Sequence, residues 1–244
     1  MRKLIFDIGA HNGEDTEFYL RKGFRVVSIE ANPILSESLR KRFEVMDSHL
    51  IIENQAIADR SGYVDLYVND NKSDWSSLYK DSSEKGIYSS RKITVRAERL
   101  EVLIEKHGMP YFMKCDIEDG DIMVARQLVE VSRVFGRSPD FASFEFCDVE
   151  ILKCLSKIGY SKFQVINQTY NWMLEAPSPP REGDYVKKSF DAFSSGLFGR
   201  ELDPKKWIDH NTASRIYDRF NELKTLDPLV CPGWLDIHAT RCDV

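Results

Sequence analysis

Two acidic residues and two glycines near the start of the chain are spaced as in a ligand-binding loop. A short apolar run that begins at Leu4 ends in Asp7, and the chain then turns through Gly9 and Gly13. A second apolar run ends in Glu30. A β-α-β unit with glycines in its first turn and an acid closing its second strand is typical of a nucleoside-binding site. The glycines let the backbone approach the ligand, and the acid accepts hydrogen bonds from the ribose hydroxyls.

The spacing of these glycines indicates which nucleoside cofactor fits. Dinucleotide-binding proteins carry G-x-G-x-x-G, which brings a pyrophosphate to the helix N-terminus. Here His11 stands between Gly9 and Gly13, and Asp7 precedes them. A carboxylate at the strand end repels pyrophosphate and attracts a cation, and S-adenosylmethionine carries an ammonium and a sulfonium. The pattern therefore favours an S-adenosylmethionine-dependent methyltransferase over an NAD-dependent dehydrogenase.

The elements that position these residues alternate between strands and helices, which predicts an α/β fold. Apolar runs bounded by turn residues predict the strands, and apolar residues at helical spacing predict the helices. After a first strand from Leu4, the predicted strands are Arg25–Glu30, Leu50–Ile57, Tyr111–Ile117, Phe141–Phe146, Tyr160–Asn167 and Trp234–Thr240. The predicted helices are Glu14–Lys22, a helix from Asn32, Leu100–His107, Ile122–Val131, Val149–Ile158 and Thr212–Leu223, the last with Ile216, Tyr217 and Phe220 on its buried side.

A polar excursion interrupts this alternation. Ser61 and Gly62 predict a hairpin turn, and the period-two pattern of Tyr63–Val68 predicts an antiparallel strand that pairs with Ile93–Ala97. Residues 69–92 between these strands are rich in serine, aspartate and lysine. We expect a mobile loop there, because long loops in compact domains are usually functional or mobile.

Residues 171–232 are the least regular part of the chain, with several prolines and with aromatic residues in a polar context. They lie between the last two predicted strands, on the edge of the sheet where the cofactor is expected. We interpret this insertion as a cap that binds the acceptor, although it could also only cover the sheet. The length of 244 residues fits a single methyltransferase domain, 1–244.

The composition excludes several classes of partner. The net charge is −5 and the pI about 5.6, so no basic surface indicates nucleic acid. No apolar run is long enough to span a membrane, and the basic start Met1–Lys3 leads into a strand too short for a signal peptide. The five cysteines lack C-x-x-C spacing, which indicates reduced thiols. We therefore expect a cytoplasmic protein that binds neither nucleic acid nor membrane.

Several blocks taken together resemble the FkbM family of S-adenosylmethionine-dependent methyltransferases. The resemblance covers about residues 4–165. Asp119 and Gly120 stand where the family has Glu directly followed by Gly. The matching blocks are Phe6–Gly13, Ile29–Pro33, Asn54–Ile57 ahead of a Ser-Gly turn, Ser76–Leu78 and Lys114–Asp121.

This resemblance implies the fold and the cofactor site. The expected fold is the class I, Rossmann-like methyltransferase fold: a seven-stranded, mostly parallel sheet with an antiparallel last strand, helices on both faces, and a cap before the last strand. S-adenosylmethionine is the implied cofactor, and Gln55 and Ala56 stand where the loop after the third strand passes the adenine. The predicted cofactor contacts are Asp7, Gly9, Ala10, His11, Asn12, Gly13, Thr16, Glu30, Ala31, Asn32, Gln55, Ala56, Ser77 and Asp116.

The resemblance also implies O-methylation of a hydroxyl on a sugar, polyketide or related metabolite, so the partner is a small-molecule or glycan acceptor. Methyl transfer is an in-line displacement for which an enzyme supplies proximity and alignment. A hydroxyl also needs a base to take its proton. The candidates are Asp116 and Glu118 after the fourth main strand, Glu145 after the fifth, and His238 on the last strand. Histidine has the best intrinsic pKa for this role.

Three other interpretations remain open at this stage. The chain could methylate nitrogen on a peptide or amine, or it could bind S-adenosylmethionine without catalysis. A metal-assisted reaction could use Asp116 with Glu118 or Glu145, since carboxylates suit Mg²⁺. The acids of residues 116–121 are equally explained by favourable interaction with the N-terminus of the following helix, so we predict no metal. The oligomeric state is left open.

Overall fold

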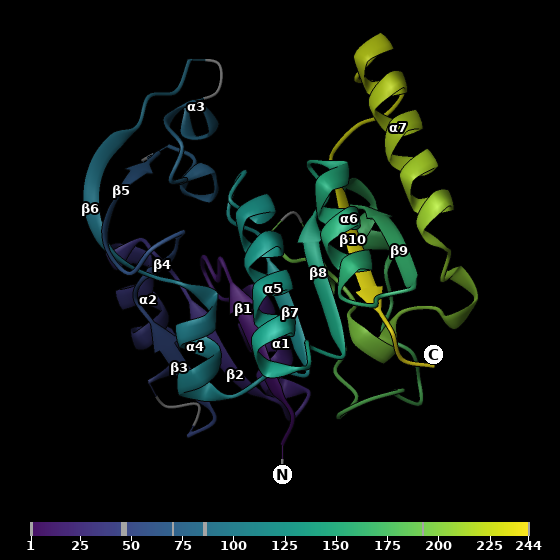
Figure 1. Ribbon diagram of the computed structural model, residues 1–244, viewed down its shortest axis with the longest axis horizontal. Coiled ribbons are helices and arrows are strands. Elements are labelled where there is room, and N and C mark those ends of the chain that lie inside the picture. Colours follow the sequence, from purple (N-terminus) through teal and green to yellow (C-terminus); the bar gives the residue numbers. More distant parts are fainter. Residues whose placement is uncertain (1, 45–47, 70, 85–86, 192, 244) are drawn as a thin grey trace.

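The computed structural model describes residues 2–44, 48–69, 71–84, 87–191 and 193–243. Asp70, Lys85 and Gly86 of the predicted loop 69–92, and Met1 and Val244 at the ends of the predicted domain, lie outside the described residues. Strands and helices alternate through most of the chain, and an irregular segment precedes the last helix and the last strand (Figure 1).

The elements have the following bounds. The strands are β1 (Leu4–Ile8), β2 (Arg25–Ile29), β3 (Leu50–Glu53), β4 (Ala56–Ile57), β5 (Gly62–Val68), β6 (Arg91–Glu98), β7 (Phe112–Cys115), β8 (Phe141–Glu145), β9 (Lys162–Asn167) and β10 (Leu235–Thr240). The α-helices are α1 (Glu14–Arg21), α2 (Pro33–Phe43), α3 (Lys80–Ser83), α4 (Leu100–His107), α5 (Asp121–Phe135), α6 (Val149–Lys157) and α7 (His210–Leu226). Short 3₁₀ helices are η1 (Ser73–Trp75), η2 (Gln168–Met173), η3 (Gly199–Glu201) and η4 (Pro204–Lys206).

Among the described residues, seven strands form the main sheet in the order β3-β2-β1-β7-β8-β10-β9. The five strands from β3 to β8 in this order are parallel to one another. Only β10 runs antiparallel, between β8 and β9. The predicted fold class, a mostly parallel seven-stranded sheet with an antiparallel last strand, is confirmed.

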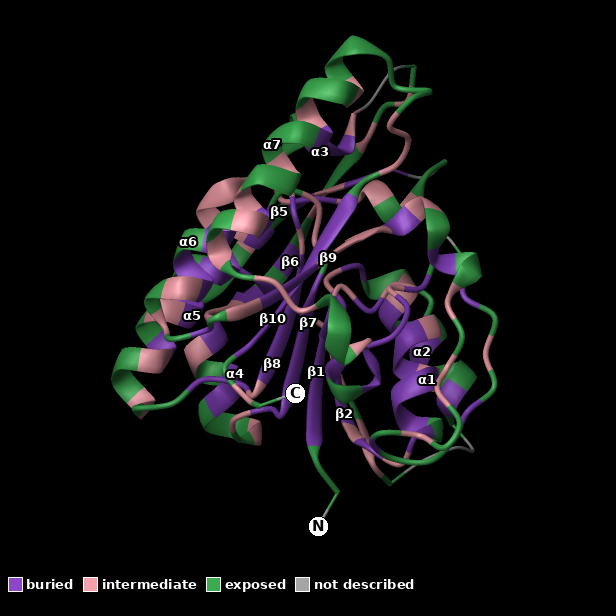
Figure 2. Ribbon diagram, turned by 90° about the vertical axis from the view of Figure 1, so that its right-hand side faces the viewer, coloured by how far each residue is buried: buried purple, intermediate pink, exposed green. Residues whose placement is uncertain are grey.

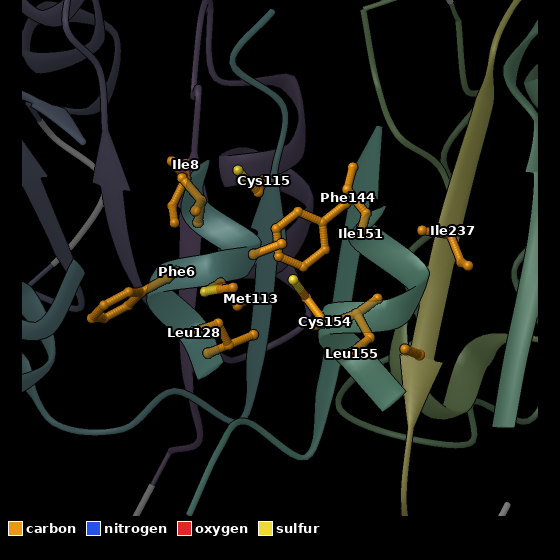
Figure 3. Packing of buried hydrophobic residues seen from close by; sticks show 14 of the residues in the cluster. Phe6, Ile8, Met113, Cys115, Leu128, Phe144, Ile151, Cys154, Leu155 and Ile237 are labelled. Atoms are coloured by element: carbon orange, nitrogen blue, oxygen red, sulfur yellow. The ribbon is translucent and has the colours of Figure 1, made fainter. Parts of the chain in front are cut away.

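Helices cover both faces of this sheet (Figure 2). On one face, α4, α5, α6 and α7 pack over the side chains of Phe6, Met113 and Phe144, and Figure 3 shows this core with Leu128 of α5 and Leu155 of α6. On the other face, α1 and α2 cover the part of the sheet from β3 to β7, since Tyr19 of α1 packs on Phe112 of β7 and α2 contacts β3. Strands of a parallel sheet carry apolar side chains on both faces, so both faces of the sheet must be covered by other elements.

One row of residues on the α1 face is polar across almost the whole sheet. The strand register places these six residues side by side, and all six are buried. Buried polar side chains are costly unless they are hydrogen-bonded, so this row indicates that the sheet has a functional role in addition to its structural one. Its members, in order across the sheet, are Ser28, Asp7, Lys114, Ser143, His238 and Gln164.

The segment between β9 and β10 supplies the cover that α1 and α2 do not. Phe190 and Phe198 from this segment pack edge-on against Phe18 of α1, with ring centroids 5.3 and 6.0 Å from that of Phe18. The Lys22 Nζ atom lies 3.0 Å from the Glu201 Oε1 atom, and both side chains are fully buried. Much of the predicted cap 171–232 is therefore built into the face of the sheet.

Two details of the predicted strands are wrong. The predicted strand Leu50–Ile57 is divided: β3 joins the main sheet, whereas β4 pairs with β6 in a separate three-stranded sheet of order β4-β6-β5. Ser61 and Gly62 do not form a hairpin, because β6 lies between β4 and β5. The predicted pairing of 63–68 with 93–97 is confirmed. The cause of the division is Asn54, whose side chain donates to the backbone carbonyls of Glu30 and Ala31 and turns the chain.

The predicted buried side of the helix near residue 216 is also partly wrong. In α7, Ala213 and Phe220 face the core, Tyr217 is half-buried against Phe146, and Ile216 is 40% exposed. The helix rises past the sheet, so only part of one side has anything to pack against (Figure 1). Within the described residues, no helix combines the length and the apolar composition needed to cross a bilayer.

Candidate active site

A cavity of about 690 Å³ opens at the carboxyl edge of the main sheet. Ligands bind at this edge in open α/β sheets. Two parts of the chain rise beyond it, the small sheet with α3 on one side and α7 on the other (Figure 1). Twelve predicted site residues line the cavity: Gly9, Ala10, His11, Asn12, Glu30, Ala31, Gln55, Ala56, Ser77, Asp116, Glu118 and Glu145. Five do not: Asp7, Gly13, Thr16, Asn32 and His238.

The turn between β1 and α1 forms the floor of the cavity. The N–H groups of Gly9 and Ala10 both donate to the Ile29 carbonyl, which ties this turn to the end of β2. Gly9 has φ +81°, and a Cβ atom there would lie 1.9 Å from the Asp116 carbonyl oxygen. Only glycine fits this position, since the left-handed backbone and the contact with β7 both exclude a side chain.

Glu30 stands at the end of β2 with its carboxylate held by backbone groups. Its two oxygens accept hydrogen bonds from the N–H groups of His11, at 2.9 Å, and Asn32, at 2.8 Å. Burial raises the pKa of Glu30 to about 7 against these hydrogen bonds, which lower it. The carboxylate is therefore fixed in orientation while it faces the cavity, and a second lone pair on each oxygen is free to accept from a ligand hydroxyl.

Asp7 lies beneath the cavity rather than on its wall. Its Oδ2 atom accepts a hydrogen bond from the Thr16 hydroxyl at 2.6 Å, and its Oδ1 atom is 3.6 Å from the Lys114 Nζ atom. Burial raises the pKa of Asp7 to about 6, although the charge of Lys114 opposes this shift. The sequence hypothesis of two carboxylates that grip one ligand is thus met only in part, since Glu30 faces the cavity and Asp7 supports it from below.

Lys114 on β7 joins three carboxylates at the centre of the site. Its Nζ atom is 3.2 Å from Asp15 and 3.6 Å from both Asp7 and Asp116. Burial alone would lower the pKa of Lys114, but these three charges raise it well above its usual value. Asp15 also accepts from the backbone N–H of Ser195, which brings the segment between β9 and β10 to the cavity wall.

His11 connects both flanks of the cavity. Its Nε2 atom lies 2.8 Å from the Ser73 hydroxyl, and its ring stacks on that of Phe193 at 6.1 Å. The backbone of His11 has φ +49°, which is uncommon for a residue with a side chain. Burial lowers the pKa of His11, so the ring is neutral near pH 7. His11 lines the cavity and is therefore placed to contact a bound ligand.

The segment between β5 and β6 holds the loop that follows β7. The Ser77 hydroxyl donates to the Glu118 carbonyl at 2.7 Å, and the Ser82 hydroxyl donates to Asp119 at 2.5 Å. Glu118 and Asp119 both have positive φ, 49° and 64°. Two consecutive strained residues at the edge of a cavity indicate that the surroundings enforce this shape. Ser77 therefore lines the cavity and also holds the loop that follows β7.

The other end of the cavity is acidic. Glu145 closes β8, and Asp236 at the start of β10 is its partner in the register. Both line the cavity. His238, one of the four predicted candidates for the base, lies one row deeper, where both of its ring nitrogens lack a hydrogen bond. Burial lowers the pKa of His238 to about 4. Among the described residues no group of three His, Cys, Asp or Glu side chains could hold a metal ion.

Three residues at the centre of the site were not among the predicted contacts: Asp15, Lys114 and Asp236. Each carried some signal. Asp15 is an acid in the first helical turn, Lys114 is a charged residue inside an apolar strand, and Asp236 shares a face with His238 in the alternating last strand. Their role depends on which strands are neighbours, which a local pattern does not contain.

Comparison with known proteins gives the family. The chain matches the model of the methyltransferase FkbM domain over residues 7–160. No curated protein matches it. Among solved structures it is similar to a precorrin 8w decarboxylase from Methanobacterium thermoautotrophicum, with 11% identity, 77% of each chain covered and a TM-score of 0.39. It is also similar to a precorrin-6y C5,15-methyltransferase from Geobacter metallireducens, with 9% identity, 99% of this chain and 82% of that chain covered, and a TM-score of 0.42. Because the family model matches more than half of the chain, this protein belongs to the FkbM methyltransferase family.

Proposed function

We propose that this protein uses S-adenosylmethionine to methylate a hydroxyl group on a sugar, polyketide or related small molecule. The observation that carries the proposal is the position of Glu30. A buried carboxylate, oriented by two backbone N–H groups, faces the same cavity as the Gly9 turn. This arrangement suits a nucleoside ligand. The carboxylate can accept hydrogen bonds from the ribose hydroxyls, and the glycine turn lets the rest of the ligand lie close to the protein backbone.

The residues of the cavity fit S-adenosylmethionine in charge as well as in shape. Glu30, Asp15 and Asp116 supply negative charge, and Lys114 neutralises only part of it. A ligand with an ammonium and a sulfonium suits such a cavity, and a pyrophosphate does not. Gln55 and Ala56 line the cavity beyond Glu30, where the adenine would lie. When bound, S-adenosylmethionine supplies an electrophilic methyl group.

The chain itself supplies alignment. Glu30 would hold the ribose, and Asp15 with Asp116 would face the amino-acid part. Lys114 keeps these two acids in place. Such positioning of two reactants is the main contribution that a protein makes to methyl transfer.

The acceptor would enter from the side of the segment between β9 and β10. Phe193, Ser195, Lys224 and Trp234 line the cavity there. The mixture of aromatic rings and polar groups suits a sugar or another hydroxylated ring. We therefore keep the proposal that residues 171–232 bind the acceptor, in addition to covering the sheet, and that loop 69–92 moves during entry.

Isothermal titration with S-adenosylhomocysteine tests the cofactor. We expect micromolar binding by the wild-type protein and at least a tenfold weaker Kd for Glu30→Ala, about 1.4 kcal/mol. Glu37→Ala on the exposed side of α2 is the matched control and should bind as the wild type does. Tighter binding of NAD than of S-adenosylhomocysteine would refute the proposal.

Methyl transfer itself is tested with labelled S-adenosylmethionine and a panel of methyl glycosides, phenols and primary amines. O-methylation predicts label in alkali-stable ethers of the hydroxyl compounds. Label found in the amines alone would refute the choice of oxygen as the acceptor atom. Addition of EDTA should leave the rate unchanged.

A further inference from the structure

The acidic end of the cavity contains a residue that the proposed function does not yet use. Resting on that proposed function, we propose that Asp236 is the catalytic base that takes the proton of the acceptor hydroxyl. The acceptor would then be held over β8 and β10, at the opposite end of the cavity from Glu30.

The strand register brings Asp236 to the edge of the sheet. It is the direct partner of Glu145 in the antiparallel pair of β10 and β8. Directly paired residues have their side chains on the same face, about 5 Å apart at Cβ. Asp116 follows β7, the next strand along, one residue after the pair of Cys115 with Phe144. Three carboxylates thus stand in one row across three neighbouring strands.

Asp236 differs from the other carboxylates of the site in its partners. It is 8% exposed and lines the cavity, yet within the described ranges its carboxylate accepts no hydrogen bond. Glu30 accepts from two backbone N–H groups, and Asp15 accepts from the Ser195 N–H and contacts Lys114. A buried carboxylate without a partner is costly. A ligand hydroxyl would supply the missing donor.

The other candidates for the base are less suitable. Asp116 is 3.6 Å from Lys114, and its side chain is 47% exposed. His238 does not line the cavity, and its buried ring lies one row below Asp236 on the same strand. Glu118 lies in the loop held by Ser77, on the side of the cavity next to the segment between β5 and β6. Glu145, the remaining candidate, is only half-buried. Within the described residues, Asp236 is the one candidate of these five that combines burial with contact to the cavity and no hydrogen-bond donor on its carboxylate.

The electrostatic setting of Asp236 suits proton transfer. Burial, followed by the charges of Asp116 and Glu145, raises the pKa of Asp236 well above its usual value, and Lys114 only partly opposes this. Asp121 on α5 is a further acid that raises it. A carboxyl group with a raised pKa is a stronger base. A sulfonium bound above it would favour the ionised form before transfer, and the loss of that charge afterwards would favour the protonated form.

The proton and the electrons balance in this step. The acceptor oxygen forms a bond to the methyl carbon, and the electron pair of the broken carbon–sulfur bond stays on sulfur. The acceptor O–H bond breaks, and its proton goes to the carboxylate of Asp236. No oxidant, reductant or metal takes part.

Sinefungin provides a test that needs no acceptor. In this analogue an ammonium on carbon replaces the methylsulfonium group, so it presents N–H donors where the methyl group would stand, and S-adenosylhomocysteine has nothing there. We expect the wild-type protein to bind sinefungin at least tenfold more tightly than S-adenosylhomocysteine, as a charge-assisted hydrogen bond allows. In Asp236→Asn this preference should fall to threefold or less, with the Kd for S-adenosylhomocysteine nearly unchanged.

Two further variants make the result specific. Glu145→Gln should reduce the preference by a smaller factor, and Asp218→Asn, an exposed position on α7, should leave it unchanged. An unchanged preference in Asp236→Asn, or no preference in the wild-type protein, would overturn the assignment of the base and leave the proposed function standing. Failure of the wild-type protein to bind either ligand would instead refute the proposed function. Circular dichroism of Asp236→Asn checks that it is folded.

Discussion

The two halves of the carboxyl edge differ in how well their polar groups are satisfied. At β1, β2 and β7 the carboxylates have partners, as with Glu30 on two N–H groups and Asp15 on Lys114. At β8 and β10 the buried atoms Ser143 Oγ, His238 Nδ1 and His238 Nε2 have no hydrogen-bond partner. Ser143 and His238 are direct neighbours in the register. In the first half the Asp7 Oδ1 atom also lacks a hydrogen bond, but it lies 3.6 Å from the Lys114 Nζ atom. We call the first half the complete half because each of its carboxylates has a hydrogen-bond or ion-pair partner without a ligand, whereas the second half contains polar atoms with neither.

This difference indicates a division of labour. A half whose groups are already oriented can bind one fixed ligand with little loss of entropy, which suits a cofactor. In the second half, Asp236 lines the cavity and accepts no hydrogen bond within the described residues, so a ligand that donates to it would stabilise that half, which suits an acceptor. The helix α1 covers the first half, and an irregular segment covers the second, so the cover is also more variable where the acceptor would bind.

The largest expected effect is in the complete half. Gly9→Ala places a Cβ atom 1.9 Å from the Asp116 carbonyl oxygen at a residue with φ +81°. Both the clash and the backbone strain must be relieved by moving β1 from β7. We expect the free energy of unfolding to fall by more than about 4 kcal/mol, at the extreme of single substitutions, as measured by urea denaturation.

Gly136→Ala separates the clash from the strain. Gly136 has φ +66° at the end of α5, and a Cβ atom there would have no atom within 4 Å. It should cost only about 1 kcal/mol, the penalty for a left-handed residue. Equal losses for Gly9→Ala and Gly136→Ala would mean that the turn is not tightly fitted, and the contrast between the halves would weaken.

The second effect concerns the cover of the other half. Glu201→Ala leaves Lys22 buried without its partner and leaves the N–H groups of Arg181 and Glu182 without an acceptor. Loss of one partner from a buried ion pair costs about 3–5 kcal/mol, measured by urea denaturation. The double variant Lys22→Met, Glu201→Gln removes both charges and keeps an acceptor for these N–H groups, so it should recover most of this loss. A single variant as stable as the wild type would show that the segment between β9 and β10 is loosely attached.

Sequence patterns were sufficient for the elements whose causes are local. The helix α4 has the predicted bounds Leu100–His107, and the turn at Gly9 and the acid at Glu30 were found from spacing alone. Apolar periodicity and turn residues determine such elements. The division of the predicted strand at Asn54 was missed, because it depends on a contact with the backbone carbonyl of Glu30, the residue that follows β2.

The candidate site was harder to predict than the fold. The alternation in β10 placed Asp236 and His238 on one face, and the pKa of free histidine favoured His238. The register with β8 decides which of the two reaches the cavity, and this register is set by pairing over ninety residues apart in sequence, from 145 to 236. Burial then reverses the preference that the free amino acids suggest, because it lowers the pKa of His238 and raises that of Asp236.

The third effect depends on pH. Burial, and then the charge of Asp116, raises the pKa of Asp121 to about 7. The folded protein therefore binds more protons than the unfolded chain between about pH 4 and pH 7, and stability falls as pH rises through this window. Asp121→Asn keeps the acceptor for the Ile117 N–H and removes the titration. We expect the variant to be about 2 kcal/mol more stable than the wild type at pH 8, with the advantage gone below pH 4.

Urea denaturation across this pH range measures the difference. Glu130→Gln, an exposed acid on the same helix, is the control and should show no such trend. If the advantage of Asp121→Asn grew as the pH fell, the assigned direction of the pKa shift would be wrong. Asp121 lies between the two halves, so its titration also reports how strongly the acidic end is desolvated.

The smallest effect is at the contact that joins the two halves. Phe193 is 56% exposed, and its ring stacks on His11 at 6.1 Å. Aromatic pairs contribute about 0.5–1.5 kcal/mol, and this one is at the low end because it is open to solvent. Phe193→Ala should weaken S-adenosylhomocysteine binding about threefold by titration calorimetry, since His11 would lose its support, and should leave stability nearly unchanged. Tyr185→Ala, which removes an equally exposed ring of the same segment away from the cavity, should change neither. If both variants weakened binding alike, the two halves would be coupled through the whole segment and not through the His11 stack.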